Sequence, residues 1–433
     1  MPAYRAPRGT RDLLPDERPA WERLETIARD LGRRYGYASI ETPLFESSDV
    51  FERGIGAGTD VVEKELYRIS ASRGEDAERW ALRPEATAGI ARAYVQHGLQ
   101  TWPQPVRVSM LGPMFRYDRP QAGRFRQFWQ WDVEAIGDAG PAVDAEIIEL
   151  AHRFYHEAGL PTVDILINSI GDPVCRPTYI DALRAHFAPH ADRLVGLERE
   201  RLATNPLRLL DSKDPAIADL IASAPVITDR LCDACAAHFA AVRAHLDALG
   251  VAYRLEPRLV RGLDYYTRTV FEVYPAGALG QQDAIGSGGR YDGLVELLGG
   301  KPTPGIGFAL GLDRLVLALA EAGLAPPYAA LPTAVVVGAD PADTATRLRI
   351  ATDLRAAGLA ARADLGQRKL GRQLEGAVRD GAHFAIIVGD ELANGQVQVR
   401  DLSAATQRLV NVPDLARELT RAHGAHRHGV ADA

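Results

Sequence analysis

The chain has 433 residues, a length typical of two to four domains. Hydrophobic residues make up 46% and charged residues 25%, which is the composition of a folded globular protein and excludes disorder as the main state. The 50 basic and 57 acidic residues give a net charge of −7, which excludes a generally basic nucleic-acid-binding coat but not a local basic patch.

The N-terminal part of the chain alternates helical and strand-like patterns. It begins without an apolar segment, so we expect no signal peptide. Hydrophobic spacing predicts a helix over 21–35, followed by a strand-like segment at 38–46. An amphipathic helix is predicted over 143–160 and a strand over 162–171.

A mostly helical stretch follows and then gives way to strands again. From about 172 to 250 the pattern is helical, and strand-like segments return at 253–261, 269–274 and 281–287. A helix at 311–324 closes this part of the chain. We therefore predict a sheet domain that a helical insertion, at about 172–250, interrupts.

The C-terminal part has a different organisation. The longest uncharged run, 322–339, contains three prolines, which argues against a membrane span and indicates a proline-rich linker at 326–332. The linker would end a first domain at 1–325. Strand and helix patterns alternate over 333–422, which predicts a small α/β domain. We expect the tail, 423–433, to be disordered.

The segment 112–134 combines arginines with aromatic residues in an otherwise acidic sequence. It contains four arginines before Gln130 and a single acid, and arginine side chains bind phosphate oxygens through paired hydrogen bonds. The aromatic rings among them are suited to stacking on a base. After Gly123, strand alternation places six residues, five of them polar, on one face: Arg124, Arg126, Phe128, Gln130, Asp132 and Glu134. This face indicates the floor of a ligand site, and a solvated hairpin is the alternative that the pattern leaves open.

Four further stretches suit ligand binding, and each also has a purely structural interpretation. Glu85 and Thr87 either face a ligand amine or begin a helix. Arg261 lies beside a glycine turn, either in a site or in an exposed loop. The glycine-rich stretch 284–300 permits close approach to a ligand but lacks the P-loop ending and the Rossmann spacing. Arg314 lies near the start of a predicted helix, where the helix dipole disfavours a positive charge. An arginine at this position is favourable if it binds a phosphate.

The three cysteines are too few for a disulfide framework, which favours a reducing cytoplasm. Cys232 and Cys235 form a CxxC pair, a pattern that also occurs in zinc sites. Cys235 shares helical spacing with the hydrophobic residues of 239–249, so we favour a buried core thiol. Only Cys175 and His238 are conceivable as further ligands, and we expect no metal site.

Taken together, these stretches resemble the class II aminoacyl-tRNA synthetases, and within that class the histidyl-tRNA synthetase family. FRYDRPQAGRFRQF is similar to the second motif of the class, ALGLDR to the third, and ETPLFE, with Pro43, to the first. RGLDYYTRTVFE and GGRYDGL are similar to two segments specific to the histidyl family. The resemblance covers essentially the whole chain.

The resemblance implies an α+β fold, in which a class II antiparallel sheet has flanking helices and a helical insertion, and an anticodon-binding α/β domain follows. It implies ATP-dependent ligation of L-histidine to histidine tRNA through a histidyl-adenylate, with ATP as substrate and Mg²⁺, in a cytoplasmic homodimer. The first motif would belong to the dimer interface. The alternative is the histidine-binding regulatory subunit of ATP phosphoribosyltransferase, a non-catalytic paralogue that lacks the C-terminal domain.

The resemblance also implies roles for individual residues. No enzyme nucleophile is needed, so the catalytic residues are two arginines at the α-phosphate, Arg261 and Arg116. Histidine is expected to contact Glu85, Ala86, Thr87, Arg116, Gln130, Glu134, Arg261, Tyr265, Tyr266 and Tyr291. ATP is expected to contact Arg116, Asp118, Arg124, Phe128 and Arg314. The acceptor end of the tRNA is expected to contact Arg119 and Gln121.

Within these sets, the expected contacts are more specific. Glu134 and Tyr266 are expected to bond the two imidazole nitrogens of the substrate. Its α-amino group is assigned to Glu85, Thr87 and Gln130. In the ATP set, Phe128 would stack on adenine and Arg314 would contact the γ-phosphate.

Overall fold

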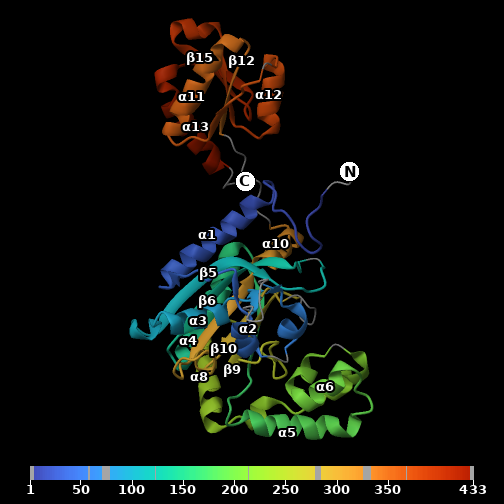
Figure 1. Cartoon of the computed structure of the whole chain (residues 1–433). Coiled ribbons are helices and arrows are strands. Elements are labelled where there is room, and N and C mark those ends of the chain that lie inside the picture. The colour runs from blue at the N-terminus through green and yellow to red at the C-terminus, as the bar shows by residue number, and fades with distance from the viewer. Residues whose placement is uncertain are drawn as a thin grey trace. The chain divides into compact units, whose positions relative to one another are not determined.

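The computed structural model contains two compact units, Met1–Pro326 and Pro327–Ala433 (Figure 1). It describes residues 4–56, 59–70, 79–121, 123–212, 214–277, 284–324, 333–366 and 368–429. The boundary between the units falls in the segment 326–332 that the sequence predicts as a linker, and this segment lies outside the described residues. Among the described residues, no helix has the length and apolar character needed to cross a membrane.

The first unit is built on an eight-stranded sheet with the order β1-β5-β6-β11-β10-β9-β7-β8. Its strands are β1 (Ala38–Ser39), β5 (Val106–Phe115), β6 (Gln127–Ile136), β7 (Val163–Ser169), β8 (Arg254–Leu255), β9 (Thr267–Pro275), β10 (Gly286–Arg290) and β11 (Gly305–Gly311). Neighbouring strands are antiparallel except at the two edges, where β1 pairs with β5 and β8 with β7 in parallel. This sheet confirms the predicted α+β class.

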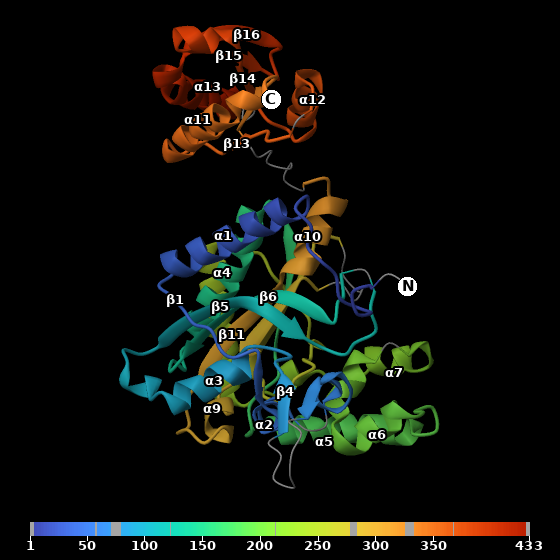
Figure 2. The same ribbon diagram turned by 45° about the horizontal axis from the view of Figure 1, so that its top comes forward.

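Helices cover both faces of the sheet, and the alternation along β6 separates the two faces. Trp131, Val133 and Ala135 pack with helices on one face. These helices are α1 (Arg18–Arg34), α4 (Pro141–Ala158), α8 (Asp233–Leu249) and α10 (Leu312–Glu321). Figure 2 shows α1 and α4 on one side of the sheet, and α3 (Thr87–Gln96) and α9 (Leu294–Leu297) on the other. The intervening positions of β6 therefore face α3, as the alternation predicts.

The segment 38–46, expected to form one strand, is divided between two sheets. Only its ends are strands, in β1 and in β2 (Phe45–Ser47). Pro43 lies between them and has no N–H to donate to a ladder, which accounts for the interruption. A small sheet of order β2-β4-β3 then forms with β4 (Arg79–Leu82) and β3 (Arg68–Ser70), next to α2 (Ser48–Ile55).

The helical insertion leaves the sheet after β7 and returns before β9, the strand that pairs with β7. It contains α5 (Arg176–Phe187), α6 (Leu197–Thr204) and α7 (Ala218–Ala222). The next helix, α8, falls within the expected range of 172–250 but packs on α4, because Phe239, Val242 and Leu246 join the core of the sheet. Of the strand expected at 253–261, only the two residues of β8 are strand, and Glu256 adds one backbone hydrogen bond to Ile167 of β7 (3.0 Å).

The second unit is an α/β domain with a five-stranded sheet of order β13-β12-β14-β15-β16. The strands are β12 (Ala334–Gly338), β13 (Ala361–Ala363), β14 (Phe384–Val388), β15 (Gln396–Asp401) and β16 (Thr406–Asn411). The helices are α11 (Thr344–Ala356), α12 (Leu370–Arg379) and α13 (Leu415–Gly429). Helix α13 ends at Gly429 and so extends into the tail, 423–433, that we expect to be disordered.

Candidate active site

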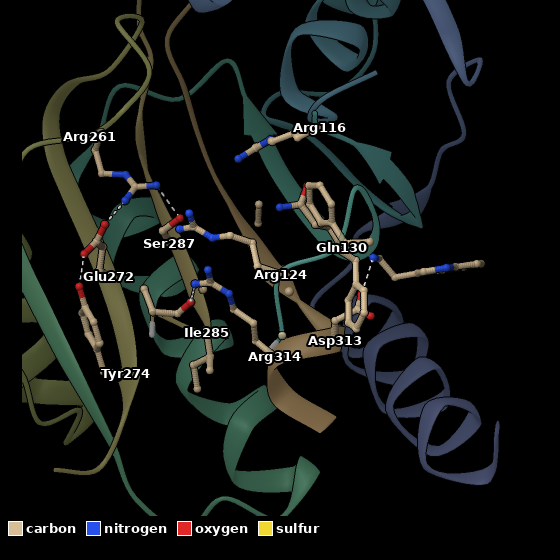
Figure 3. A pocket seen from close by; sticks show the side chains of 18 of the residues that line it. Arg116, Arg124, Gln130, Arg261, Glu272, Tyr274, Ile285, Ser287, Asp313 and Arg314 are labelled. Atoms are coloured by element: carbon tan, nitrogen blue, oxygen red, sulfur yellow. Dashed lines mark hydrogen bonds and ion pairs between the residues drawn. The ribbon is translucent and has the colours of Figure 1, made fainter. Parts of the chain in front are cut away.

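Two adjoining cavities lie on the face of the sheet toward α3, with volumes of about 380 and 150 Å³. We refer to them as the large cavity and the small cavity. The residues that line both are Arg116, Gln130, Arg261, Ser287 and Ala309. In Figure 3, Arg116 and Arg261 lie on opposite sides of the large cavity. The shared wall therefore carries two of the arginines that the sequence analysis singles out.

The carboxylate of Glu134, on β6, is fully buried and bonds to two residues that line the small cavity. Its Oε1 accepts a hydrogen bond from Thr87 Oγ1 (2.6 Å) and its Oε2 accepts one from the Tyr291 hydroxyl (2.5 Å). Burial raises the pKa of Glu134 to about 8, although both hydroxyls oppose the shift. Gly307, opposite Glu134 on β11, makes room for this side chain, because a Cβ there would collide with Oε2.

Glu85 combines the two interpretations that the sequence leaves open. Its carboxylate accepts hydrogen bonds from the backbone N–H of Thr87 (2.8 Å) and Ala88 (2.9 Å), and so it stabilises the start of α3. Both Glu85 and Thr87 also line the small cavity. The pKa of Glu85 is raised above its ordinary value, because the effect of burial exceeds the opposing effect of its hydrogen bonds to the start of α3.

Three tyrosines form an aromatic wall of the small cavity. The rings of Tyr265 and Tyr266 lie 4.6 Å apart between centroids, and those of Tyr265 and Tyr291 lie 5.9 Å apart. A Cβ at Gly289 would come within 2.9 Å of the Tyr266 ring, and one at Gly305 would collide with the Tyr291 ring. These two glycines therefore make space for tyrosine rings.

Two buried acceptors on β6 have no hydrogen-bond partner among the described residues. One is Oε1 of Gln130, which lines both cavities. The other is the carboxylate of Asp132, whose pKa burial raises, with further contributions from Glu134 and Glu85. The strand alternation had placed Asp132 on this face without assigning it a role.

Arg261 is held in a defined orientation by two residues that the sequence analysis did not identify. One guanidinium nitrogen pairs with Glu272, and the other donates to Ser287 Oγ (2.6 Å). Glu272 also accepts a hydrogen bond from the Tyr274 hydroxyl (2.6 Å). Ser287 and Glu272 lie directly opposite each other on β10 and β9, so their partnership depends on strand register.

The remaining predicted arginines surround the large cavity. Arg116 donates from Nε to the carbonyl of Pro84 (2.8 Å), and its guanidinium carbon lies 5.4 Å from the ring centroid of Phe128. Arg314 donates to the carbonyl of Ala284 (2.7 Å). These side chains, with Arg124 and Arg261, give a cavity suited to a phosphorylated ligand with an aromatic base.

Five of the predicted contact residues lie outside the lining of both cavities: Ala86, Asp118, Arg119, Gln121 and Glu134. Of these, Glu134 bonds to two residues that line the small cavity, Thr87 and Tyr291. Ala86 is buried next to the start of α3. Asp118 forms an ion pair with Arg124 (2.9 Å), so it acts on the large cavity only through that arginine. Arg119 and Gln121 are exposed on the hairpin between β5 and β6.

Comparisons with known proteins assign the same parts of the chain to two families. The model of histidyl-tRNA synthetase matches residues 9–315, and that of an anticodon binding domain matches residues 333–421. The histidine–tRNA ligase of Desulforudis audaxviator is 48% identical over 96% of this chain and 98% of its own length. The ligase of Pelotomaculum thermopropionicum is 46% identical over 95% and 96%. The crystal structure of apo S. aureus histidyl-tRNA synthetase superimposes with a TM-score of 0.80, at 36% identity, over 96% of this chain and all of that one.

Proposed function

This chain belongs to the histidyl-tRNA synthetase family and ligates histidine to histidine tRNA at the expense of ATP, and from that premise we propose how its two cavities divide the reaction. The small cavity binds histidine and the large cavity binds ATP. The observation that carries this assignment is the shared wall, because Arg116 and Arg261 reach the place where the two ligands must meet.

Histidine recognition rests on buried polar groups of the small cavity. Glu134 accepts from one imidazole nitrogen and Tyr266 bonds the other. The unpartnered Oε1 of Gln130 accepts a hydrogen bond from the α-amino group, beside Glu85 and Thr87. A site of this kind leaves its own groups unpaired when an analogue lacks the matching atoms, which permits discrimination of roughly 10⁴–10⁵-fold.

In the first step, an oxygen of the histidine carboxylate attacks the α-phosphorus of ATP. The new O–P bond forms as the bond to the bridging oxygen breaks, and pyrophosphate leaves. Arg116 and Arg261 stabilise the charge that develops on the phosphorus oxygens, with no enzyme nucleophile. Phe128 stacks on adenine, and Arg314 binds the γ-phosphate. Mg²⁺ enters with ATP as part of the substrate.

In the second step, a hydroxyl of the terminal ribose of the tRNA attacks the carbonyl carbon of the adenylate, and AMP leaves. Arg119 and Gln121 are exposed on the hairpin beside the large cavity, and we assign them to the acceptor end. The second unit contacts the anticodon. Relatives that match nearly the whole chain, this unit included, are ligases, which argues against the regulatory-subunit alternative.

We further propose a cytoplasmic homodimer whose interface includes the segment 41–46. Leu44 and Phe45 in this segment are 44% and 49% exposed, and partner burial of such side chains is favourable. Sedimentation of the full chain tests this part. The homodimer is supported if the full chain sediments as a dimer and the Phe45→Glu variant sediments as a monomer. An unmodified chain that is monomeric at micromolar concentration contradicts it.

The decisive test is pyrophosphate exchange with ATP and magnesium, supplying each of the twenty amino acids in turn and no tRNA. Exchange with histidine alone establishes adenylation and its specificity, and aminoacylation of tRNA follows as the second assay. Exchange with a different amino acid contradicts the assignment of the small cavity. Histidine binding without exchange would favour the regulatory alternative.

A further inference from the structure

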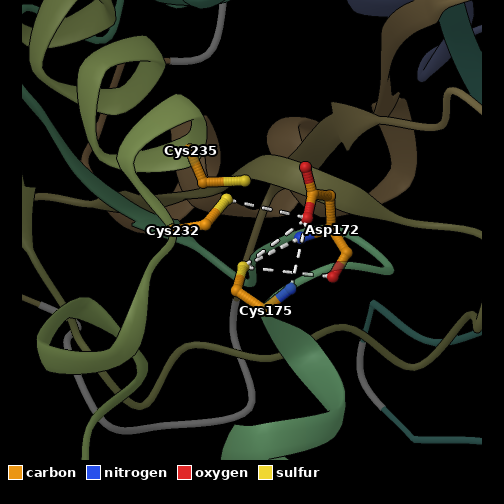
Figure 4. A group of neighbouring side chains, drawn as sticks. All are labelled: Asp172, Cys175, Cys232 and Cys235. Carbon is orange, nitrogen blue, oxygen red and sulfur yellow. Dashed lines mark hydrogen bonds between the residues drawn. The ribbon is translucent and has the colours of Figure 1, made fainter.

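All three cysteines of the chain meet one carboxylate at the base of the helical insertion (Figure 4). The cluster consists of Asp172, Cys175, Cys232 and Cys235, and their ligand atoms all lie within 4.8 Å of one another. Oδ1 of Asp172 is 3.6 Å from Sγ of Cys175 and 4.0 Å from Sγ of Cys232. We propose that these four side chains bind a structural zinc ion, a site outside both cavities of the ligase reaction.

The spacing of the four atoms fits a tetrahedral ion. Zinc–sulfur bonds of ~2.3 Å in a tetrahedron place the sulfur atoms ~3.8 Å apart, so the cluster needs to contract by less than ~1 Å to close around the metal. Thiolates are soft ligands that favour zinc over magnesium or calcium. With four protein ligands, the ion would have no open position, which makes the site structural and not catalytic.

Surrounding groups orient the ligands toward a common centre. Oδ1 of Asp172 accepts a hydrogen bond from the backbone N–H of Val174 (3.0 Å), and Oδ2 pairs with Arg268 (3.3 Å). Such outer contacts are typical of ligating carboxylates, and the arginine offsets the negative charge of the cluster. The sequence suggests His238 as a further ligand, but its Nε2 forms a hydrogen bond with Oδ2 of Asp144 (2.9 Å). His238 is not part of the cluster.

The position of the cluster gives the ion a mechanical role. Asp172 and Cys175 lie where the chain enters the insertion, and Cys232 and Cys235 lie where it leaves, at the start of α8. Arg176, the first residue of α5, donates to the carbonyls of Tyr266 (2.6 Å) and Gly171 (3.0 Å). The ion would therefore join both ends of the insertion directly beside the backbone of the small cavity.

Metal analysis of the purified full chain tests the site. We expect about one zinc per chain, and roughly a tenfold or greater loss of bound zinc in Cys175→Ser and Cys232→Ser. Asp229→Asn is the matched control, because this exposed carboxylate lies three positions before Cys232 and outside the cluster. Zinc that persists unchanged in both cysteine variants would overturn the proposal.

A second measurement uses the unmodified chain, so the test does not depend on whether the cysteine variants fold. After chelation, added Co²⁺ should produce thiolate-to-cobalt absorption, and added Zn²⁺ should protect the three thiols from a thiol reagent. A chain whose thiols react equally with and without Zn²⁺ has no such site. A loss of ~2 Da that a reductant reverses would identify a disulfide in place of the metal and would likewise contradict the proposal.

Discussion

The two cavities of the first unit differ in the burial and the charge of the residues that line them. The small cavity is lined by Glu85 and three tyrosines, all of them buried, and one of these tyrosines, Tyr291, bonds to the buried carboxylate of Glu134 behind the lining. The large cavity is wider and lined by arginines, and Arg124 there keeps a third of its side chain exposed. Buried groups are costly to leave unpaired, whereas partly solvated cations each contribute less. We therefore expect specificity to reside in the small cavity and charge neutralisation in the large one.

The wall between the cavities should show the largest effect. Arg261 lines both cavities, and Arg261→Gln removes its positive charge from each of them. We therefore expect kcat for histidine-dependent pyrophosphate exchange to fall by roughly 10³-fold. Arg254→Gln, an exposed arginine on β8, is the control and should leave the rate unchanged. An increase in KM alone, with kcat intact, would show that Arg261 contributes only to binding.

The small cavity should respond to loss of its carboxylate with a change confined to histidine. Glu134→Gln replaces one carboxyl oxygen with an NH₂ group, which cannot accept a hydrogen bond, and we expect the KM for histidine to rise about 10²-fold while the KM for ATP changes little. Glu296→Gln, an exposed glutamate on α9, is the matched control. Equal increases for both substrates would contradict the division between the cavities.

A single methyl group should disturb the same cavity through its shape. Gly307→Ala would place a Cβ against Glu134 Oε2 and 2.5 Å from the carbonyl oxygen of Val133. We expect a roughly tenfold higher KM for histidine and a thermal midpoint a few degrees lower. Gly293→Ala is the control, since a Cβ there meets nothing within 4 Å. An unchanged KM for histidine would show that β11 moves enough to accommodate the added methyl group without disturbing Glu134.

The large cavity should respond with a change confined to ATP. Arg314→Gln removes one cation from a wide site, and we expect the KM for ATP to rise about fivefold to tenfold, with the KM for histidine unaffected. Steady-state exchange at varied ATP measures this, with Arg254→Gln again as control. A larger effect on histidine than on ATP would reverse our assignment of the two cavities.

The last prediction concerns stability and its dependence on pH, and not the kinetics. Because burial raises the pKa of Glu134 from 4.5 to about 8, the folded chain binds more protons than the unfolded chain between these values. Stability should therefore fall as the pH rises through this range, by at most about 1.4 kcal/mol per pH unit from this residue. Denaturant unfolding of the first unit at several pH values should show a flatter dependence in Glu134→Gln. An unchanged slope would indicate that Glu134 titrates normally.

Much of this arrangement could be predicted because it depends on local periodicity. The period of two along β6 places Gln130 and Glu134 on the ligand face and Trp131 in the core, and the structure confirms this alternation. The roles of the individual residues came from the resemblance and remain proposals. Pro43 also marks the place where the strand expected at 38–46 is interrupted, because proline has no N–H to donate to a ladder.

The partners that hold these residues could not be predicted, because they depend on contacts between distant strands. Glu272 and Ser287 meet only through the register of β9 and β10. The same holds for Asp172, which reaches Cys232 across 60 positions of the chain. A CxxC pair with a single further cysteine did not reveal this carboxylate, since nothing in the linear pattern links the two ends of the insertion.

The wall that the two cavities share has a consequence for inhibitor chemistry. A molecule that fills both cavities at once loses its translational and rotational freedom only once, whereas two separate ligands lose theirs independently. A non-reactive linkage between a histidine-like and an adenosine-like part would lie between Arg116 and Arg261. Its selectivity would come from the small cavity, so the adenosine part can be simplified further than the imidazole part before selectivity is lost.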